Sequence, residues 1–203
     1  MTLILLLESF IKERIIFTMY AINIYMGGTG AGKSTYSAYL SKQYLKKGLN
    51  VYSNVEIKGT KKITLDDLFN YNISDGLVIF DEAGLEFDSR NFKAFKDNYV
   101  KFFKLHRHYN LDIALFTQFY DDVDKKIRNI TKNIFHIKKS IFPRFIALRR
   151  IHSYITVDEN NDIVLKYQYA SLLSIKRIYA PRYYKYFNSF HRIELPEKDF
   201  QVY

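Results

Sequence analysis

The sequence predicts an α/β fold in which a mostly parallel sheet is covered by helices on both faces. Apolar runs of four to six residues alternate with segments of helical periodicity, the pattern of parallel strands joined by crossover helices. The first run ends in a glycine-rich turn that leads directly into a helix. With 203 residues, of which 48% are hydrophobic and 26% charged, the chain can form one domain, and disordered and collagen-like classes are excluded.

The first half of the chain predicts three strands and two helices. Residues 21–26 are apolar and β-branched and end at glycines, which predicts a strand, and residues 34–47 have the spacing of a helix with one buried face. A second strand is predicted at residues 51–54 and a short helix at residues 65–71. The run at residues 77–80 is apolar throughout, as expected of a parallel strand buried on both faces.

The middle of the chain continues this alternation. We expect a helix at residues 92–108, a fourth buried strand at residues 111–116, a short helix at residues 125–130 and a fifth strand at residues 134–137. These segments complete the set of strands and crossover helices that a parallel sheet requires.

The segments after the fifth strand change in character. Residues 145–157 and 163–169 flank a polar turn, which predicts a β-hairpin, and a basic, aromatic tail follows. The charge is unequal along the chain: up to Lys125 it has 16 basic and 15 acidic residues, and from Lys126 onward 15 and 6. This asymmetry favours contact with a polyanion, either nucleic acid or an anionic membrane face.

The sequence lacks two features, cysteine and a long apolar run, and each absence excludes certain kinds of site or protein. The chain contains no cysteine, which excludes disulfide scaffolds, thiolate metal sites and cysteine nucleophiles. It also lacks a run of about 20 predominantly apolar residues, so we expect no transmembrane helix, and its start does not fit a secretory signal.

Residues 27–34 match the phosphate-binding pattern G-x-x-x-x-G-K-[ST] between a predicted strand and a predicted helix. Such a loop curls so that its backbone N–H groups surround a phosphate at a helix N-terminus. Lys33 is expected to reach the β- and γ-phosphates, and the Ser34 hydroxyl to bind Mg²⁺. The predicted nucleotide-binding residues are Gly27, Gly28, Thr29, Gly30, Ala31, Gly32, Lys33, Ser34 and Thr35.

Polar side chains follow two of the buried strands. Asp81 and Glu82 come directly after residues 77–80, at the strand edge where α/β sheets bind ligands. Asp81 fits the second Mg²⁺ partner, and Glu82 fits the base that orients an attacking water. Gln118 follows the strand at residues 111–116 and is the candidate sensor of the γ-phosphate. The candidate catalytic residues are therefore Lys33, Glu82 and Gln118, and the candidate metal ligands are Ser34 and Asp81.

The paired carboxylates Asp81 and Glu82 indicate which class of P-loop NTPase the fold belongs to. Many GTPases and small-molecule kinases lack a carboxylate at the Glu82 position, whereas P-loop NTPases of the additional-strand class (ASCE, RecA-like) carry one. We divide the chain accordingly into an N-terminal extension at residues 1–18, a P-loop core at residues 19–140, and a C-terminal hairpin and tail at residues 141–203 that completes the same domain. The extension is either an amphipathic helix that touches a membrane or partner, or a segment upstream of a natural start at Met19.

Two further groups of polar residues, two histidines and three arginines, are candidates for a functional role. His106 and His108 are two residues apart, a spacing that does not bring two side chains together on a helix, so we expect no shared metal. Arg90, Arg107 and Arg128 are candidates for an arginine that acts on the nucleotide of a neighbouring subunit.

The sequence resembles the N-terminal ATPase domain of the zonula occludens toxin (Zot) family, the filamentous-phage assembly proteins related to the FtsK and HerA motors. The matching blocks are the loop at 27–34, Phe80-Asp81-Glu82-Ala83 with Phe87 and Arg90, Leu105-His106-Arg107-His108 leading through Leu111-Asp112-Ile113 to Thr117-Gln118, and a weaker aromatic match at 183–190. The resemblance covers residues 21–191. It implies an ATP-driven machine for assembly and extrusion of virions, in the host cytoplasm or against the inner face of the cell membrane. Family members usually continue into a transmembrane helix and a periplasmic domain, and the sequence up to Tyr203 contains neither.

Four functional hypotheses follow. The first is a motor that hydrolyses ATP with Mg²⁺ for virion assembly or DNA export, as a homo-oligomeric ring with virion or membrane proteins as partners. The second is a viral genome-packaging ATPase whose basic C-terminal third contacts DNA. A P-loop kinase of a small molecule and a non-hydrolysing nucleotide-gated adaptor are the alternatives outside the motors. Glu82 counts against both, and Gln118 also counts against the kinase.

Overall fold

The structure, a computed structural model, describes residues 20–86, 97–157 and 163–188. The predicted extension at residues 1–18, the candidate Arg90 and the last part of the basic tail lie outside the described residues.

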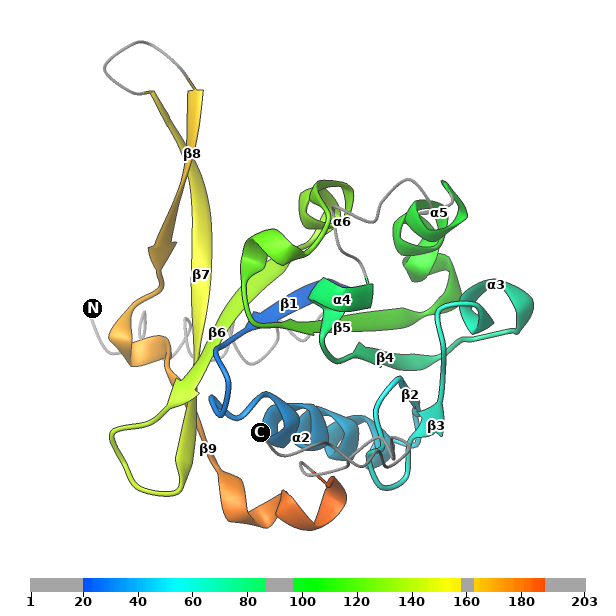
Figure 1. Cartoon of the computed structure of the whole chain (residues 1–203), viewed down its shortest axis with the longest axis horizontal. Helices are drawn as coiled ribbons and strands as arrows, with labels where there is room; N and C mark the ends of the chain where they lie inside the picture. The colour runs from blue at the N-terminus through cyan, green and yellow to red at the C-terminus, as the bar shows by residue number, and fades with distance from the viewer. Residues whose placement is uncertain (1–19, 87–96, 158–162, 189–203) are drawn as a thin grey trace, which may run out of the picture.

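Strands from most of the described chain join in one sheet, in the order β3-β2-β4-β5-β1-β6-β7-β8, and β9 also pairs with β7 (Figure 1). The strands are β1 (Ile22–Met26), β2 (Asn50–Ser53), β3 (Lys61–Lys62), β4 (Gly76–Phe80), β5 (Leu111–Thr117), β6 (Asn133–Lys139), β7 (Phe145–Val157), β8 (Ile163–Tyr169) and β9 (Lys176–Tyr179). Pairs among β1 to β6 are parallel, and β7 pairs antiparallel with β6, β8 and β9.

Strand β5 lies between the strand that precedes the glycine-rich loop and the strand that precedes the paired carboxylates. Leu115 pairs with Ile24 of β1 on one side and with Phe80 of β4 on the other. Because the three strands are parallel, their carboxyl ends meet at one edge of the sheet. This order confirms the predicted P-loop NTPase fold of the additional-strand (ASCE, RecA-like) class.

Helices cover both faces of the sheet, as predicted (Figure 1). They are α2 (Lys33–Leu45), α3 (Asp67–Asn70), α4 (Ala83–Glu86), α5 (Asp97–Leu105) and α6 (Lys125–Ile130). On the α2 face, Tyr36 packs against Tyr25 and Phe116, and the Tyr25 and Phe116 rings stack with their centroids 5.0 Å apart. The opposite face packs Phe103 of α5 and Ile127 of α6 in a second core. The alternation of neighbouring side chains along β1 therefore supplies both cores.

Some elements differ from the expectation. The predicted helix at residues 92–108 is described from Asp97, and its last part is a 3₁₀ turn, His106–Tyr109, that ends at Asn110 with a left-handed backbone (φ 54°). Strand β9 was not predicted from the sequence. Ile178 is the one buried residue in it, so the segment has no apolar pattern that marks a strand. Its pairing with residues 145–148 of β7 depends on the fold. The short elements β3 and α4 were also not predicted.

The predicted hairpin forms from β7 and β8. Strand β6 pairs with residues 146–151 of β7, whereas residues 152–157 pair with β8 alone. The hairpin therefore projects from the body as a two-stranded ribbon (Figure 1). In the part of the chain that the structure describes, no helix combines the length and the apolar character needed to cross a membrane.

Two residues of the matching block that runs from Leu105 to Gln118 hold the start of β1. His106 is 6% exposed, and its ring nitrogens lie 2.6 Å from the Phe103 carbonyl oxygen and 2.9 Å from the Tyr20 carbonyl oxygen. Asp112 accepts hydrogen bonds of 2.7 Å from the Ala21 N–H and from the Tyr44 hydroxyl at the end of α2. The block thus joins β1, β5 and α2 at the edge of the sheet away from the glycine-rich loop.

The Asp112 contacts give a prediction on stability. Asp112→Ala removes two hydrogen bonds to a carboxylate, so we expect it to lower the free energy of unfolding by about 2–3 kcal/mol. Tyr44→Phe removes one of them and is expected to cost less in the Asp112→Ala background than in the wild type. Urea denaturation of the four proteins measures both effects. An Asp112→Ala protein as stable as the wild type would contradict this role.

Candidate functional site

A pocket of about 970 Å³ opens at the carboxyl ends of β1, β4 and β5. It brings together the candidate catalytic residues Lys33, Glu82 and Gln118 and the candidate metal ligands Ser34 and Asp81. Of the predicted nucleotide-binding residues, those that line it are Gly28, Thr29, Gly30, Gly32, Lys33, Ser34 and Thr35. Gly27 and Ala31 are not part of this lining.

The glycine-rich loop is fixed by the strands around it. The Gly27 N–H donates to the Thr117 carbonyl at 3.1 Å, which continues the ladder between β1 and β5. Gly32 precedes α2 with a left-handed backbone (φ 104°), and a Cβ atom there would lie 2.5 Å from Cγ2 of Ile146 in β7. Glycine is therefore required at this position for both backbone conformation and space.

Lys33 places a buried positive charge in this loop. Its side chain is 9% exposed, and its Nζ donates to the Gly27 carbonyl at 2.9 Å. The ammonium stands beside the N-terminus of α2, where the helix dipole and unpaired N–H groups also favour an anion. The local field of the loop thus suits a phosphate group.

Asn54, a residue that the sequence analysis did not select, positions the two carboxylates. Its side-chain Nδ2 donates to the Asp81 carbonyl at 3.0 Å, and its Oδ1 accepts from the Asp81 N–H at 2.8 Å. The Asp81 Oδ1 in turn accepts from the Glu82 N–H at 3.0 Å, and Glu82 has a left-handed backbone (φ 49°). Non-glycine residues in this conformation are strained and concentrate at functional sites. The position of Asn54 directly after strand β2, which neighbours β4, is the sequence feature that could have indicated its contact with Asp81.

The partly buried Asp81 carboxyl has a raised pKa. Burial is the main cause, and the Glu82 carboxylate adds to it, while the Glu82 N–H and the Lys33 charge oppose it. A divalent cation bound by this carboxylate would favour its charged form. Oxygen ligands of this kind, one carboxylate and one hydroxyl beside a phosphate site, are those that Mg²⁺ takes in nucleotide enzymes. Asp81 and Ser34 therefore fit a Mg²⁺ site that substrate phosphates would complete.

The raised pKa predicts that Asp81→Asn stabilises the metal-free protein at pH 7. The folded state holds the Asp81 proton more tightly than the unfolded state, so its contribution to stability is lost as the pH rises from about 3.8 through the raised pKa. Asparagine has no such proton and still offers an acceptor to the Glu82 N–H. We therefore expect the Tm of the variant at pH 7 to be higher than that of the wild type. Thermal melts between pH 4 and 8 test this, and a lower Tm for the variant at pH 7 would contradict it.

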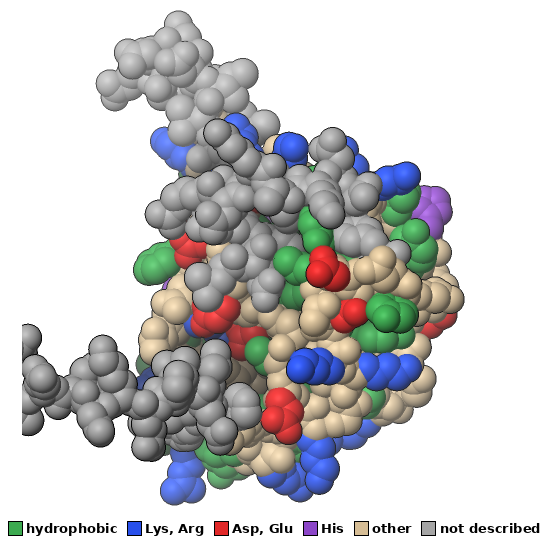
Figure 2. Space-filling model, turned by 45° about the vertical axis from the view of Figure 1, so that its right-hand side comes forward, with side chains coloured by type: hydrophobic (Ala, Val, Ile, Leu, Met, Phe, Trp, Pro, Cys, Tyr) green, Lys and Arg blue, Asp and Glu red, His purple; other side chains and the backbone are tan. Residues whose placement is uncertain are grey.

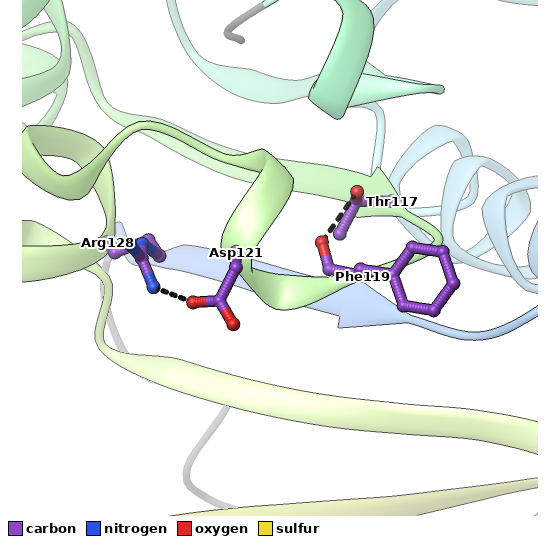
Figure 3. A network of polar contacts seen from close by, with 4 residues as sticks. All are labelled: Thr117, Phe119, Asp121 and Arg128. Carbon is purple, nitrogen blue, oxygen red and sulfur yellow. Dashed lines mark hydrogen bonds and ion pairs between the residues drawn. The ribbon is translucent and has the colours of Figure 1, made fainter. Parts of the chain in front are cut away.

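Gln118 enters the pocket from the turn after β5. The Thr117 hydroxyl closes that turn by donating to the Phe119 carbonyl at 3.0 Å (Figure 3). In the same view Arg128 forms an ion pair with Asp121. The Arg128 guanidinium carbon also lies 4.9 Å from the centre of the Tyr120 ring. Arg128 is thus engaged within its own chain.

The other candidates outside the pocket are placed as follows. Arg107 is exposed in the turn before β5, at the edge of the sheet away from the pocket. His106 is buried, whereas His108 is exposed. Among the residues that the structure describes, no cluster of three or more histidine, aspartate or glutamate side chains forms a metal site. In the view of Figure 2 the acidic side chains lie mostly across the middle of the face, and lysine and arginine side chains also gather at its top and bottom.

Half of the pocket lining was missed by the sequence analysis. It comes from the turn between β6 and β7 and from the segment after β9. The residues are Lys139, Ser140, Phe142, Pro143, Arg144, Phe145, Ile146, Ala180, Tyr184, Phe187 and Asn188. The Ala180 N–H donates to the Arg144 carbonyl at 2.8 Å and so joins the two segments.

Comparisons with known proteins agree with this architecture. Residues 43–158 match the family model for zonular occludens toxin (Zot). The N-terminal domain of zonular occludens toxin from Neisseria meningitidis superposes with a TM-score of 0.54 at 16% identity, over 84% of this chain and 100% of that one. None of the curated proteins matches the sequence.

Two further solved structures are similar at lower TM-scores. The genome packaging NTPase B204 from Sulfolobus turreted icosahedral virus 2, in complex with sulfate, gives a TM-score of 0.45 at 13% identity, over 73% of this chain and 96% of that one. The RadB recombinase gives 0.45 at 12% identity, over 76% and 89%.

Proposed function

Since the chain belongs to the zonular occludens toxin (Zot) family, we propose that it is a motor that hydrolyses ATP with Mg²⁺ to drive virion assembly and extrusion or DNA export. One observation carries the proposal: Lys33, Glu82 and Gln118, from three separate parts of the chain, line the same pocket as the glycine-rich loop. We place its work in the host cytoplasm or at the inner face of the cell membrane.

The chemistry would consist of positioning and charge neutralisation. Loop N–H groups and Lys33 would hold the phosphates, and Ser34 and Asp81 would hold Mg²⁺, which neutralises the charge of the β- and γ-phosphates when bound. The Glu82 carboxylate would accept a proton from the attacking water. Gln118, at the end of the additional strand, would contact the γ-phosphate and report its presence to β5.

Genome packaging is the second candidate function, and the charge distribution favours it. The exposed cations of the described chain from Lys126 onward are Lys126, Lys132, Lys138, Lys139, Arg144, Lys166, Arg177, Arg182 and Lys185. Such residues contact phosphates of nucleic acid through charge alone, which makes binding dependent on salt. Both candidates use the same hydrolytic pocket and differ in what the motor moves.

Phosphate release from ATP with Mg²⁺, measured with and without single- and double-stranded DNA and over a range of protein concentrations, tests the proposal. We expect turnover, and a rate per subunit that rises with protein concentration if sites are shared in a ring. Stimulation by one form of DNA would favour packaging or DNA export, whereas a rate indifferent to DNA would favour work on virion or membrane proteins. Transfer of phosphate to a small acceptor, or binding without turnover, would overturn the motor.

A further inference from the structure

The pocket has two chemically different halves. The glycine-rich loop, Asp81, Glu82 and Gln118 make one half, which is polar and suited to phosphates. Phe142, Tyr184 and Phe187 bring aromatic rings to the other half, which also contains the cations Lys139 and Arg144. We propose that this aromatic half is the nucleoside subsite, in which the base of the bound nucleotide stacks on Phe142 and Tyr184. The inference rests on the proposed function, since it requires a nucleoside triphosphate at the loop.

The β6–β7 turn carries the first of these rings and is held beside the loop. The Ser140 N–H donates to the Phe145 carbonyl at 2.9 Å, and the Ser140 hydroxyl accepts from the Phe142 N–H at 3.2 Å. Arg144 in the same turn has a left-handed backbone (φ 64°). The close approach of Ile146 to Gly32 then sets the distance between the turn and the phosphate half.

The segment after β9 carries the other two rings and is tied to the core. The Lys58 N–H donates to the Tyr186 carbonyl at 2.7 Å, and Lys42 Nζ of α2 donates to the Tyr186 hydroxyl at 2.9 Å. Phe187 forms a β-bridge with Ile57. The segment thus presents Tyr184 and Phe187 from a fixed position, with their ring centroids 6.4 Å apart and the planes at 89°.

Two of the aromatic rings in the pocket are about half exposed to water, and the Arg177 guanidinium carbon lies 5.5 Å from the centre of one of them, Phe142. Phe142 is 52% exposed and Tyr184 is 54% exposed, although both line the pocket. A base that stacks on these rings would cover apolar surface that the fold leaves open to water. Every base has a face that can stack, and stacking on an aromatic side chain contributes substantially to the affinity of nucleotides.

Calorimetric titration of the full chain with ATP and with inorganic tripolyphosphate, both with Mg²⁺, separates the two halves of the pocket. We expect the wild type to bind ATP about 10–100-fold more tightly than tripolyphosphate. Tyr184→Ala and Phe142→Ala should each weaken ATP binding about 10-fold and leave tripolyphosphate binding unchanged, and Tyr184→Phe, which retains the ring, should bind as the wild type does. Tyr71→Ala is the matched control, because Tyr71 is 69% exposed and precedes β4 at the opposite edge of the sheet.

The outcomes distinguish the two proposals. Equal affinity of the wild type for ATP and tripolyphosphate, or ATP binding that both alanine variants retain in full, overturns the nucleoside subsite and leaves the phosphate site standing. A wild-type protein that binds neither ligand overturns the nucleotide site itself and the subsite with it.

Discussion

Glu82→Gln is expected to lower kcat for ATP hydrolysis by about 100–10,000-fold, the range that a general base contributes, while the Kd for ATP changes little. Glutamine has the size of glutamate but cannot accept a proton from water. The substitution leaves the left-handed backbone at this position and the N–H bond to Asp81 in place. Phosphate release gives kcat, and equilibrium titration with a fluorescent ATP analogue gives the affinity.

Glu56→Gln is the control for this variant. Glu56 is an exposed glutamate outside the pocket lining, so its substitution removes one negative charge without touching the site. We expect wild-type rates from it. Turnover that persists in Glu82→Gln would show that another group activates the water.

Lys33→Ala is expected to reduce kcat/KM by about 100–1,000-fold, as for removal of a positioned donor to a developing charge, and to weaken nucleotide binding as well. The variant loses the buried ammonium of the loop and leaves the Gly27 carbonyl without its 2.9 Å partner. Both effects act on the phosphate half of the pocket, so binding of inorganic tripolyphosphate should weaken with that of ATP. This distinguishes Lys33→Ala from substitutions in the aromatic half.

Lys46→Ala serves as the comparison for Lys33→Ala. Lys46 is exposed at the end of the same helix, about 13 residues away along the chain and outside the pocket lining. The Lys46→Ala protein should bind and hydrolyse ATP as the wild type does. Unaltered affinity for tripolyphosphate in Lys33→Ala would place the phosphates elsewhere.

The phosphate half of the pocket could be predicted because its residues are set by local sequence. A loop between an apolar run and a helix, and carboxylates directly after a buried strand, have one arrangement in a parallel sheet. The Glu82 carboxylate predicted the additional-strand class, and the pairing of Leu115 with Ile24 and Phe80 places β5 between β1 and β4, as that class requires. Roles of the individual side chains in catalysis stay predictions.

The aromatic half could not be predicted because distant pairings create it. Phe142 reaches the pocket only when β7 packs against Gly32, and Tyr184 only when the segment after β9 is tied to Lys42 and Lys58. For the matching block from Leu105 to Gln118, by contrast, the sequence identified the residues and the structure supplied their role. The sequence singled out His106 and Asp112, and the structure gives them a role in holding the start of β1.

The central claim is that this pocket hydrolyses ATP with the help of a divalent cation. Phosphate release by the wild-type protein, followed with Mg²⁺, after chelation of Mg²⁺ and after its restoration, tests the claim most directly. We predict release over many turnovers that stops on chelation and resumes when Mg²⁺ returns. Binding of ATP without phosphate release, at high protein concentration and with DNA present, would contradict the account.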